Sequence, residues 1–595
     1  MKITGFLIFP ALICALITAV FLSVTAAAAP ISAAQAPGGE VKTAEQLVAA
    51  LGGEDNVDLG SDGKTVYLSR DILLMNSVII RDGDYRIVGR GCTVYRGSAD
   101  MEAMFFLTAA SLSEGSPSLI LGTDSASSDD AESADLIFDG NRDAFDTPSN
   151  GPIFGLIGNV SLRINPAVWL INNCSSAPGG AIYMSAIVYG NDYTPLSPEL
   201  TVNGALFENN SSTVDGGAIY LKGEGQSESA GQIILKSTAL KGTTVESGEY
   251  VGRGGAICAD GGALTMTSCS VESNIADNGG GVYASFETLI TACGFRMNRA
   301  TLSGGALYFD GDGYDPQNKN SAPGTLTGVF IEQNSSGGTG GAITNFGNLT
   351  VSAEEITYIS ENTSVGDGAC IYNEGLLTLN GGQLFFNKST EGRGGIFNGG
   401  SLIFTAAELR KNSARVGGAV YNEGEFKLTG GSIASNVNLE KNTPQLLNRG
   451  SLTFGGSFVI DGDIVGNCIH VDESGASVIP TIFVESKLTT AFPIKVARFV
   501  ESKQGDSVTY SLSNEKNASL YYGKNENVES AAAVSEVYHS GFGGYKVAPD
   551  GTLKFLFPVM PLWAWLLSVL GAAAVAVSAV IFVRKRKKAA NKSEG

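Results

Sequence analysis

One short glycine-rich segment carries the spacing of carboxylates that a calcium ion prefers. In Asp310-Gly-Asp312-Gly-Tyr-Asp315 the aspartates alternate with glycine and tyrosine, and a loop of this kind can gather several oxygen ligands around one ion. The downstream glutamate that completes an EF-hand loop is missing. A plain turn explains the segment better, so we expect no metal site and keep Asp310, Asp312 and Asp315 as the calcium candidate.

The residues that could move protons in catalysis are few. The chain has two histidines, His470 and His539, and neither lies near an acidic cluster in the sequence. Polysaccharide lyases and hydrolases need carboxylates grouped on one face, with a second acid or a base beside them. We therefore expect no enzyme activity, no catalytic residue and no cofactor.

Four charged residues recur at the corners of a repeated sequence. Glu374 and Glu423 occupy the same place in an Asn-Glu-Gly step, but phenylalanine, glycine or arginine fills that place in other copies. A position that accepts such different side chains is expected to be a solvated corner. Arg393 and Arg415, which come just before glycine pairs, are interpreted in the same way.

The cysteines do not form a disulfide framework or a zinc motif. Eight are present, Cys14 lies in the expected leader, and none is in a Cys-x-x-Cys pair. Cys269 and Cys293 each lie five residues before a corner asparagine, which predicts one interior column on adjacent coils, about 4.8 Å apart. A disulfide tolerates that separation, but stacked neighbours point side by side, so we expect two buried thiols.

The segments that position these residues form a repeat of about 25 residues. An Asn-x-Gly step recurs with spacings of 28, 25, 24 and 26 residues, at Asn345, Asn373, Asn398, Asn422 and Asn448. Two apolar residues follow each of these asparagines after four and six places. A second asparagine comes three residues after an apolar one, at Asn334, Asn362, Asn387, Asn412 and Asn436. A fixed period of this length is typical of a solenoid.

The chemistry of the repeat predicts a parallel β-helix. Alternating apolar residues indicate strands with one buried face. Gly-Gly and Asn-x-Gly supply residues that tolerate positive φ, which predicts sharp corners. Coils stacked about 4.8 Å apart would place like residues over one another. A propeller is excluded, since its blades need roughly 40–50 residues each.

Segments outside the repeat indicate a secreted and tethered chain. Residues 1–29 read as a signal peptide and 561–583, uncharged and followed by five basic residues, as a single transmembrane helix. Between them we expect an amino-terminal cap and first coils (41–140), the β-helix proper (141–454), and final coils or a carboxy-terminal cap (455–557). The amino-terminal cap should contain a helix, because a capping box begins at Thr43. A basic cytoplasmic tail (584–595) would follow. The net charge of −20 argues against a nucleic-acid partner.

Two motifs that recur in phase resemble a known repeat. Gly-Gly-Ala-[Ile/Leu/Val] pairs with [Phe/Ile/Leu/Val]-x-x-Asn at Phe207–Asn210 with Gly216–Ile219, Val271–Asn274 with Gly279–Val282, Phe295–Asn298 with Gly304–Leu307, and Leu409–Asn412 with Gly417–Val420. This combination, over roughly residues 170–450, resembles the repeat of the polymorphic outer-membrane proteins, a family of bacterial β-helix adhesins. The resemblance implies a right-handed, pectate-lyase-like coil and an adhesive role. That family ends in an exporting outer-membrane β-barrel, whereas the helix expected here implies direct tethering in a cell with a single membrane.

Together these features predict a cell-surface protein held by one membrane helix, with its ectodomain outside the cell. We expect it to act as an adhesin or binding protein for an extracellular protein or glycan, and its membrane contact to be the carboxy-terminal helix. Two alternatives stay open at this point: an extracellular polysaccharide lyase or hydrolase of the β-helix class, and a structural spacer without a specific ligand.

Overall fold

A computed structural model describes residues 40–51, 64–109, 115–124, 134–189, 194–223, 231–246, 248, 250–311, 323–441, 443–461, 464–471, 477–478, 480–484, 494–504, 507–512, 538–540, 545–547 and 553–555. The expected signal peptide (1–29), the expected transmembrane helix (561–583) and the expected tail (584–595) lie outside these ranges. Within them, no helix has both the length and the apolar character needed to cross a membrane.

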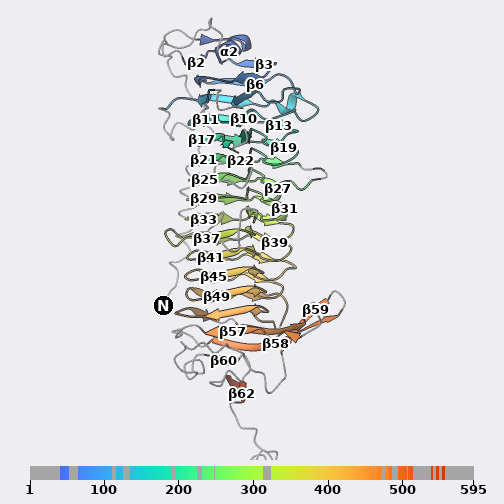
Figure 1. The fold of residues 1–595 in the computed structure, drawn as a ribbon. Helices are drawn as coiled ribbons and strands as arrows, with labels where there is room; N and C mark the ends of the chain where they lie inside the picture. Colours follow the sequence, from blue (N-terminus) through green and yellow to red (C-terminus); the bar gives the residue numbers. More distant parts are fainter. Residues whose placement is uncertain are drawn as a thin grey trace, which may run out of the picture.

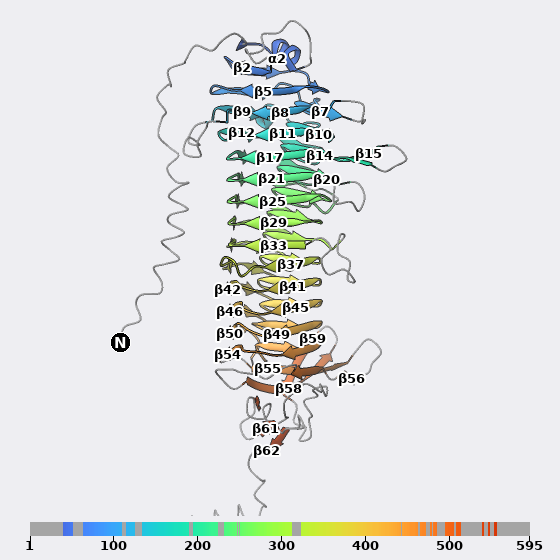
Figure 2. The ribbon, with the colours of Figure 1, turned by 60° about the vertical axis from the view of Figure 1, so that its left-hand side comes forward.

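The described chain is a rod of stacked coils, as Figures 1 and 2 show. Each coil contributes strands to sheets that run along the rod, and each strand pairs in parallel with the equivalent strand of the next coil. The predicted all-β parallel β-helix is therefore confirmed. The right-handed sense of the coil stays a prediction.

Sheet A has sixteen described strands and receives the apolar pair that follows each Asn-x-Gly step. Its strands are, in order along the rod, β1 (Glu40–Val41), β2 (Thr65–Leu68), β5 (Asp84–Val88), β8 (Ser118–Leu121), β11 (Ser161–Ile164), β17 (Glu199–Asn203), β21 (Gln232–Lys236), β25 (Ala263–Thr267), β29 (Thr288–Thr291), β33 (Pro323–Thr327), β37 (Asn348–Val351), β41 (Leu376–Leu379), β45 (Ser401–Phe404), β49 (Glu425–Leu428), β53 (Ser451–Phe454) and β57 (Thr481–Val484).

Sheet B follows sheet A in each coil and ends just before the second asparagine. Its fourteen described strands are β3 (Ile72–Leu74), β6 (Cys92–Arg96), β9 (Leu136–Asp139), β12 (Val168–Ile171), β18 (Leu206–Glu208), β22 (Ala239–Lys241), β26 (Ser270–Glu272), β30 (Gly294–Arg296), β34 (Phe330–Glu332), β38 (Tyr358–Ser360), β42 (Gln383–Phe385), β46 (Glu408–Arg410), β50 (Ser432–Ala434) and β54 (Val459–Asp461).

Sheet D comes next in each coil and consists mostly of two-residue strands. Its ten described strands are β13 (Cys174–Ser175), β19 (Ser211–Ser212), β23 (Thr244–Val245), β27 (Ile275–Asn278), β31 (Arg299–Ser303), β35 (Ser335–Ser336), β39 (Thr363–Ser364), β43 (Lys388–Ser389), β47 (Ser413–Ala414) and β51 (Val437–Asn438).

Sheet C closes each coil after the glycine pair. Its parallel strands are β4 (Val78–Ile80), β7 (Phe105–Ala109), β10 (Phe154–Gly158), β14 (Ile182–Ser185), β20 (Ile219–Lys222), β24 (Ile257–Asp260), β28 (Val282–Ala284), β32 (Leu307–Phe309), β36 (Ile343–Asn345), β40 (Ile371–Asn373), β44 (Ile396–Asn398), β48 (Val420–Asn422), β52 (Leu446–Asn448), β55 (Ile464–Val471) and β58 (Ile494–Gln504).

Shorter pieces complete the described chain. The hairpin β15 (Ile187–Tyr189) and β16 (Thr194–Leu196) projects from the side of the rod (Figure 2). A 3₁₀ turn lies at Arg142–Ala144. Near the carboxy-terminal end, strands pair around β58 and β55, in part antiparallel: β56 (Ser477–Val478), β59 (Ser507–Leu512), β60 (Tyr538–Ser540), β61 (Tyr545–Val547) and β62 (Leu553–Phe555).

The interior of the rod is filled by the apolar residues that the repeat predicted. In sheet A, Leu377 lies over Leu402 and Leu379 over Phe404, and all four side chains are fully buried. The same alternation buries one side chain of each short sheet B strand, such as Leu384. Burial of stacked apolar side chains supplies the main stabilisation of such a coil.

A helix covers the first coil, as predicted. Helix α2 (Ala44–Leu51) lies at the amino-terminal end of the rod and buries Leu47, Ala50 and Leu51 (Figure 1). Its start differs in one detail from a reciprocal capping box. The Gln46 N–H donates to Thr43 Oγ1 at 3.3 Å, but Gln46 Oε1 accepts from the Lys42 N–H at 2.8 Å instead of from Thr43.

The corners of the coil correct one expectation about glycine. The first glycine of the pair that precedes a sheet C strand has positive φ, for example 63° at Gly340 and 72° at Gly394, as expected. The glycine of the Asn-x-Gly step does not, and it is needed for space instead: a Cβ on Gly375 would clash with the carbonyl oxygen of Gly347 in the neighbouring coil. The left-handed backbone lies elsewhere, at the residue before the second asparagine.

That left-handed corner is occupied mostly by residues with side chains. The position between sheets B and D has φ between 53° and 58° in Asn172, Asn209, Ser273, Met297, Gln333, Glu361, Phe386, Lys411 and Ser435. A left-handed residue with a Cβ costs about 1–2 kcal/mol relative to the right-handed form. Each coil accepts this cost because the corner turns the next residue, an asparagine in most coils, into the interior.

Two columns of buried asparagine amides run along the rod. We call the first the turn column: Asn345, Asn373, Asn398, Asn422, Asn448 and Asn467. Each Nδ2 donates to the Oδ1 of the next member, at 2.6–3.0 Å. The second, the corner column, contains Asn173, Asn210, Asn274, Asn298, Asn334, Asn362, Asn387, Asn412 and Asn436, and it is hydrogen-bonded continuously from Asn274 onward.

The columns confirm that like residues stack in phase, and they extend beyond the predicted members. Asn467 continues the turn column past the last recognisable motif. In one coil Thr243 replaces the corner asparagine and donates its hydroxyl to Asn274 Oδ1 at 2.7 Å. At the other end, fully buried Arg96 donates to Asn173 Oδ1 at 3.1 Å and to the carbonyl oxygens of Met101, Gly151 and Pro152. Burial lowers the pKa of Arg96 to about 10, so the guanidinium remains charged at neutral pH.

Candidate binding face on sheet C

The outward face of sheet C carries a column of aromatic side chains. The middle residue of each short strand points away from the interior, and register stacks these residues as Tyr183, Tyr220, Cys258, Tyr283, Tyr308, Thr344, Tyr372, Phe397, Tyr421 and Leu447. Several of them form apolar clusters separate from the interior core. Neighbouring rings are close to parallel, as for Tyr372 and Phe397 with centroids 4.9 Å apart. Such stacking adds about 0.5–1.5 kcal/mol per pair.

Two short columns of polar residues flank the rings. One is the position just before the glycine pair, which places a side chain at the start of each sheet C strand. The other is the position just after the strand, the variable residue of the Asn-x-Gly step. Side chains from these two positions fold over the aromatic column and meet above it, so the face is assembled by the same corners that shape the coil.

The first charged network surrounds Arg253. Its guanidinium donates to Asp215 Oδ2 and to Asp260 Oδ2, each at 2.8 Å, and lies 4.9 Å from the centre of the Tyr283 ring. Asp215 and Asp260 come from opposite flanks of sheet C. The Tyr283 hydroxyl in turn donates to Asp310. One arginine thus crosses the face, pairs with an acid on each side, and covers an aromatic ring.

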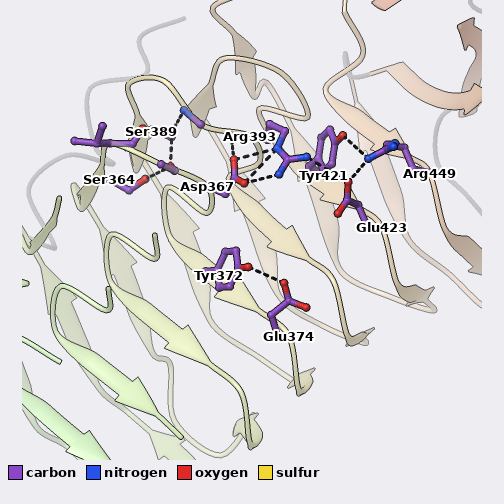
Figure 3. A network of polar contacts seen from close by, with 12 residues as sticks. Ser364, Asp367, Tyr372, Glu374, Ser389, Arg393, Tyr421, Glu423 and Arg449 are labelled. Atoms are coloured by element: carbon purple, nitrogen blue, oxygen red, sulfur yellow. Dashed lines mark hydrogen bonds and ion pairs between the residues drawn. The ribbon is translucent and has the colours of Figure 1, made fainter. Parts of the chain in front are cut away.

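The second network, drawn in Figure 3, repeats this arrangement five coils further along. Arg393 donates to Asp367 Oδ2 at 2.6 Å and to Glu423 Oε1 at 3.2 Å, and its guanidinium lies 4.5 Å from the Tyr421 ring centre. Glu423 also pairs with Arg449, whose Nη1 donates to the Tyr421 hydroxyl at 3.3 Å. Arg449 Nε lies 3.1 Å from Glu501 Oε2, which extends the alternation of charges.

These contacts shift the protonation of the arginines and tyrosines. Burial acts to lower the pKa of Arg253 and of Arg393. The hydrogen bonds with Asp215 and Asp367 and the neighbouring negative charges together outweigh it, so both pKa values lie above the ordinary range. Burial raises the pKa of Tyr283, and its hydrogen bond to Asp310 raises it further. The network arginines therefore stay cationic, and Tyr283 stays neutral, throughout the physiological range.

Most rings of the column are covered: Tyr220, Tyr283, Phe397 and Tyr421 are buried. Tyr183, Tyr308 and Tyr372 stay partly exposed, beside the fixed charges of the networks. The carboxylates of Asp215, Asp260, Asp367, Glu423 and Glu501 each contact a guanidinium. A glycosidase instead needs two carboxyl groups that face one another across a substrate bond, one of them ready to release a proton. Here the five carboxylates are paired with guanidinium groups.

The predicted calcium candidate is only partly described. Asp310 lies beside β32 and accepts a hydrogen bond from Tyr283, whereas Asp312 and Asp315 lie outside the described residues. In the described ranges, no three histidine, cysteine, aspartate or glutamate side chains come together as a metal site requires. The Nδ1 of His470 lies 3.4 Å from the Cys468 carbonyl oxygen.

The interpretation as a solvated corner residue is wrong for Arg393, whose side chain is only 28% exposed because it reaches into the network over the aromatic column. Glu423 is exposed as expected, although its carboxylate pairs with Arg393 and Arg449. Glu374 is exposed as expected, although its Oε1 accepts a hydrogen bond from the Tyr372 hydroxyl at 2.7 Å. A signal was present in the sequence: Glu423 and Arg449 are opposite charges at the same place of adjacent coils.

The two stacked cysteines lie where the repeat predicted. Cys269 and Cys293 are buried in the interior on adjacent coils, and the Cys269 N–H donates to Cys293 Sγ at 3.3 Å. Both are free cysteines, in agreement with the expectation of two thiols.

Comparison with known proteins identifies the repeat. Residues 204–222 match the model of the Chlamydia polymorphic membrane protein repeat. This segment contains β18, the corner column residue Asn210, the glycine pair at Gly216 and Tyr220 of the aromatic column. No curated protein and no solved structure matches the chain. The chain is thus a parallel β-helix that carries repeats similar to those of the Chlamydia polymorphic membrane proteins.

Proposed function

We propose that this protein is a cell-surface adhesin, or extracellular binding protein, that presents the face of sheet C to its partner and performs no catalysis. The observation that carries the proposal is the sheet C face, where the two arginine networks lie in line with the partly exposed rings of Tyr308, Phe346 and Tyr372. Rigid aromatic rings and arginines are the residues that most often supply binding energy at protein interfaces. Here they lie in line along a rod whose backbone is fixed by stacked hydrogen bonds.

The remaining parts of the chain fit this role. We propose that residues 1–29 direct secretion and that 561–583 anchor the chain in the membrane by a single helix, so that a right-handed coil stands outside the cell. The match to a repeat of membrane proteins supports a surface location. Ion pairs occupy the network carboxylates, and this favours binding over polysaccharide cleavage.

The test uses intact bacterial cells that express the full chain. Protease added outside the cells should cleave the rod, and cells that carry the chain should attach to immobilised extracellular matrix or glycans more strongly than cells without it. A variant that lacks residues 561–583 should appear in the medium. Protection of the rod from added protease, or equal attachment of both kinds of cell, would overturn the proposal.

A further inference from the structure

The two arginine networks show how side chains on the sheet C face bind a guanidinium group. Arg253 and Arg393 each place the guanidinium carbon over an aromatic ring, at 4.9 and 4.5 Å from the ring centres, and each pairs with carboxylates. A guanidinium over a ring gains electrostatic attraction from the ring face, and carboxylates fix its orientation through charged hydrogen bonds. The chain therefore contains two working examples of an arginine site on sheet C.

Between these examples lies a stretch with the rings and an acid but without the arginine. Phe346 and Tyr372 have ring centroids 6.2 Å apart, and Phe346 is 37% exposed. The exposed Glu374 carboxylate is held beside them by the Tyr372 hydroxyl. We call Phe346, Tyr372 and Glu374 the open platform.

The flank that supplies the arginine elsewhere is occupied by small neutral residues here. At the position before the glycine pair, Ser303 and Thr339 replace the aspartate and arginine of the two networks, and their hydroxyls bond to one another at 2.9 Å. Among the described residues, no lysine or arginine lies over the ring of Phe346 or Tyr372. Figure 3 shows Tyr372 and Glu374 on the same face as the second network, below the Arg393 cluster.

We infer that the open platform binds an arginine side chain of a partner protein. The partner's guanidinium would lie over Phe346 and Tyr372 and pair with Glu374, as Arg393 lies over Tyr421 and pairs with Glu423. The exposed carboxylate and the net charge of −20 favour a cation and disfavour an acidic ligand. A guanidinium suits the site better than an ammonium, since it is planar, stacks on rings and pairs with a carboxylate through two hydrogen bonds. The inference deepens the proposed function and rests on it only for the location of the face outside the cell.

The experiment measures peptide binding to the purified full chain in detergent by isothermal titration. The probe is an eight-residue acetylated and amidated peptide of glycine and serine with two arginines, and its control replaces both arginines by citrulline, a neutral isostere. We expect the citrulline peptide to bind at least about tenfold more weakly, because it keeps the shape and loses the charge.

Matched variants locate the site. Glu374→Gln and Phe346→Ala should each weaken binding of the arginine peptide about tenfold. Glu425→Gln removes the same charge from an exposed position on sheet A, and it should bind like the wild type. This control separates the platform from the general attraction of a cationic peptide to an acidic protein. Unchanged thermal melting of the exposed-site variants excludes a folding defect.

Three outcomes would overturn the inference. They are equal binding of the arginine and citrulline peptides, equal binding by Glu374→Gln and Glu425→Gln, and binding of neutral oligosaccharides that is lost in Phe346→Ala while the arginine peptide binds as before. The last would identify the platform as a glycan site. Because the assay uses purified protein, its failure differs from failure of the proposed function, which is read from protease access and attachment of cells.

Discussion

Truncation of one asparagine in the middle of the corner column tests whether the column holds the coils together. In Asn387→Ala the side chain loses its bonds to Asn412 Oδ1 and to the Ile359 carbonyl oxygen, both at 2.9 Å. From the preceding coil, Asn362 loses the Oδ1 that accepted its backbone N–H at 3.0 Å and its Nδ2 at 2.9 Å. All of these groups lie in the interior, where water cannot replace the lost partner.

The expected cost follows from these contacts. One buried backbone N–H, that of Asn362, loses its acceptor, and an unsatisfied buried donor costs about 1–3 kcal/mol. The Ile359 carbonyl and Asn362 Nδ2 each lose one buried hydrogen bond, at about 1 kcal/mol apiece. The sum is about 4 kcal/mol of local stability. Lys388→Ala changes the exposed neighbour and should cost less than about 0.5 kcal/mol.

Hydrogen exchange followed by mass spectrometry is the appropriate assay, because a solenoid opens locally and a single unfolding midpoint averages over its coils. A loss of 4 kcal/mol corresponds to about a 1,000-fold faster exchange of the Asn362 amide. We expect this loss of protection in the peptides around Asn362 and Asn387 and little change near the ends of the rod. Protection in Asn387→Ala within about threefold of that in Lys388→Ala would refute the reasoning.

Four further results are expected. Arg393→Met keeps the stem but leaves two partly buried carboxylates unpaired, and it should lower the free energy of unfolding by about 1–2 kcal/mol; an unchanged thermal midpoint would mean that solvent screens the network. Met297→Gly relieves a left-handed backbone with φ 53° and should stabilise the chain by about 0.5–1 kcal/mol, whereas Met297→Ala should give no gain. Burial raises the pKa of Glu332, so the native state binds this proton more tightly than the unfolded chain does. Glu332→Gln should therefore be more stable than the wild type at pH 7, and the difference in stability should shrink as the pH falls through the raised pKa. A stability difference that does not change with pH would contradict the assignment. Alkylation of the denatured chain without reductant should label both Cys269 and Cys293, and a cross-linked, unlabelled peptide pair would contradict the two thiols.

The sequence predicted those parts of the fold that follow from the regular spacing of its repeats. A period near 25 residues forces Asn373 over Asn398 and Leu377 over Leu402, since parallel pairing repeats each position in the next coil. The members outside the recognisable motif escaped detection: Asn467 is followed by Cys468 and Ile469 and lacks the glycine of an Asn-x-Gly step, and Arg96 comes before the repeat begins. Both act through their place in a column, which becomes visible only when the coils are stacked.

The binding face was less accessible to sequence reasoning. The networks join residues 26 and 30 positions apart, as Asp367 with Arg393 and Arg393 with Glu423, and each long side chain crosses the sheet to reach its partner. The variable residue of the Asn-x-Gly step differs from coil to coil, and this variation alone predicted a solvated position without specific partners. In the folded rod these charged residues form ion pairs between coils, so that an acid in one coil pairs with an arginine in the next.

The connection from sheet C to sheet A divides the rod into two regions with different freedom to change. From Asn345 to Ser451 this connection is always two residues, because the turn column fixes its asparagine and leaves space for only a glycine beside it. Before Asn345 the same connection lengthens repeatedly, between β14 and β17, β20 and β21, and β32 and β33. Insertions can therefore accumulate at one edge of the amino-terminal half without disturbing a hydrogen-bonded column. Natural variants of such a protein should differ in the length of these connections in the amino-terminal half and keep the two-residue connection in the carboxy-terminal half. The number of coils and the shape of the loops at the amino-terminal end could then evolve separately.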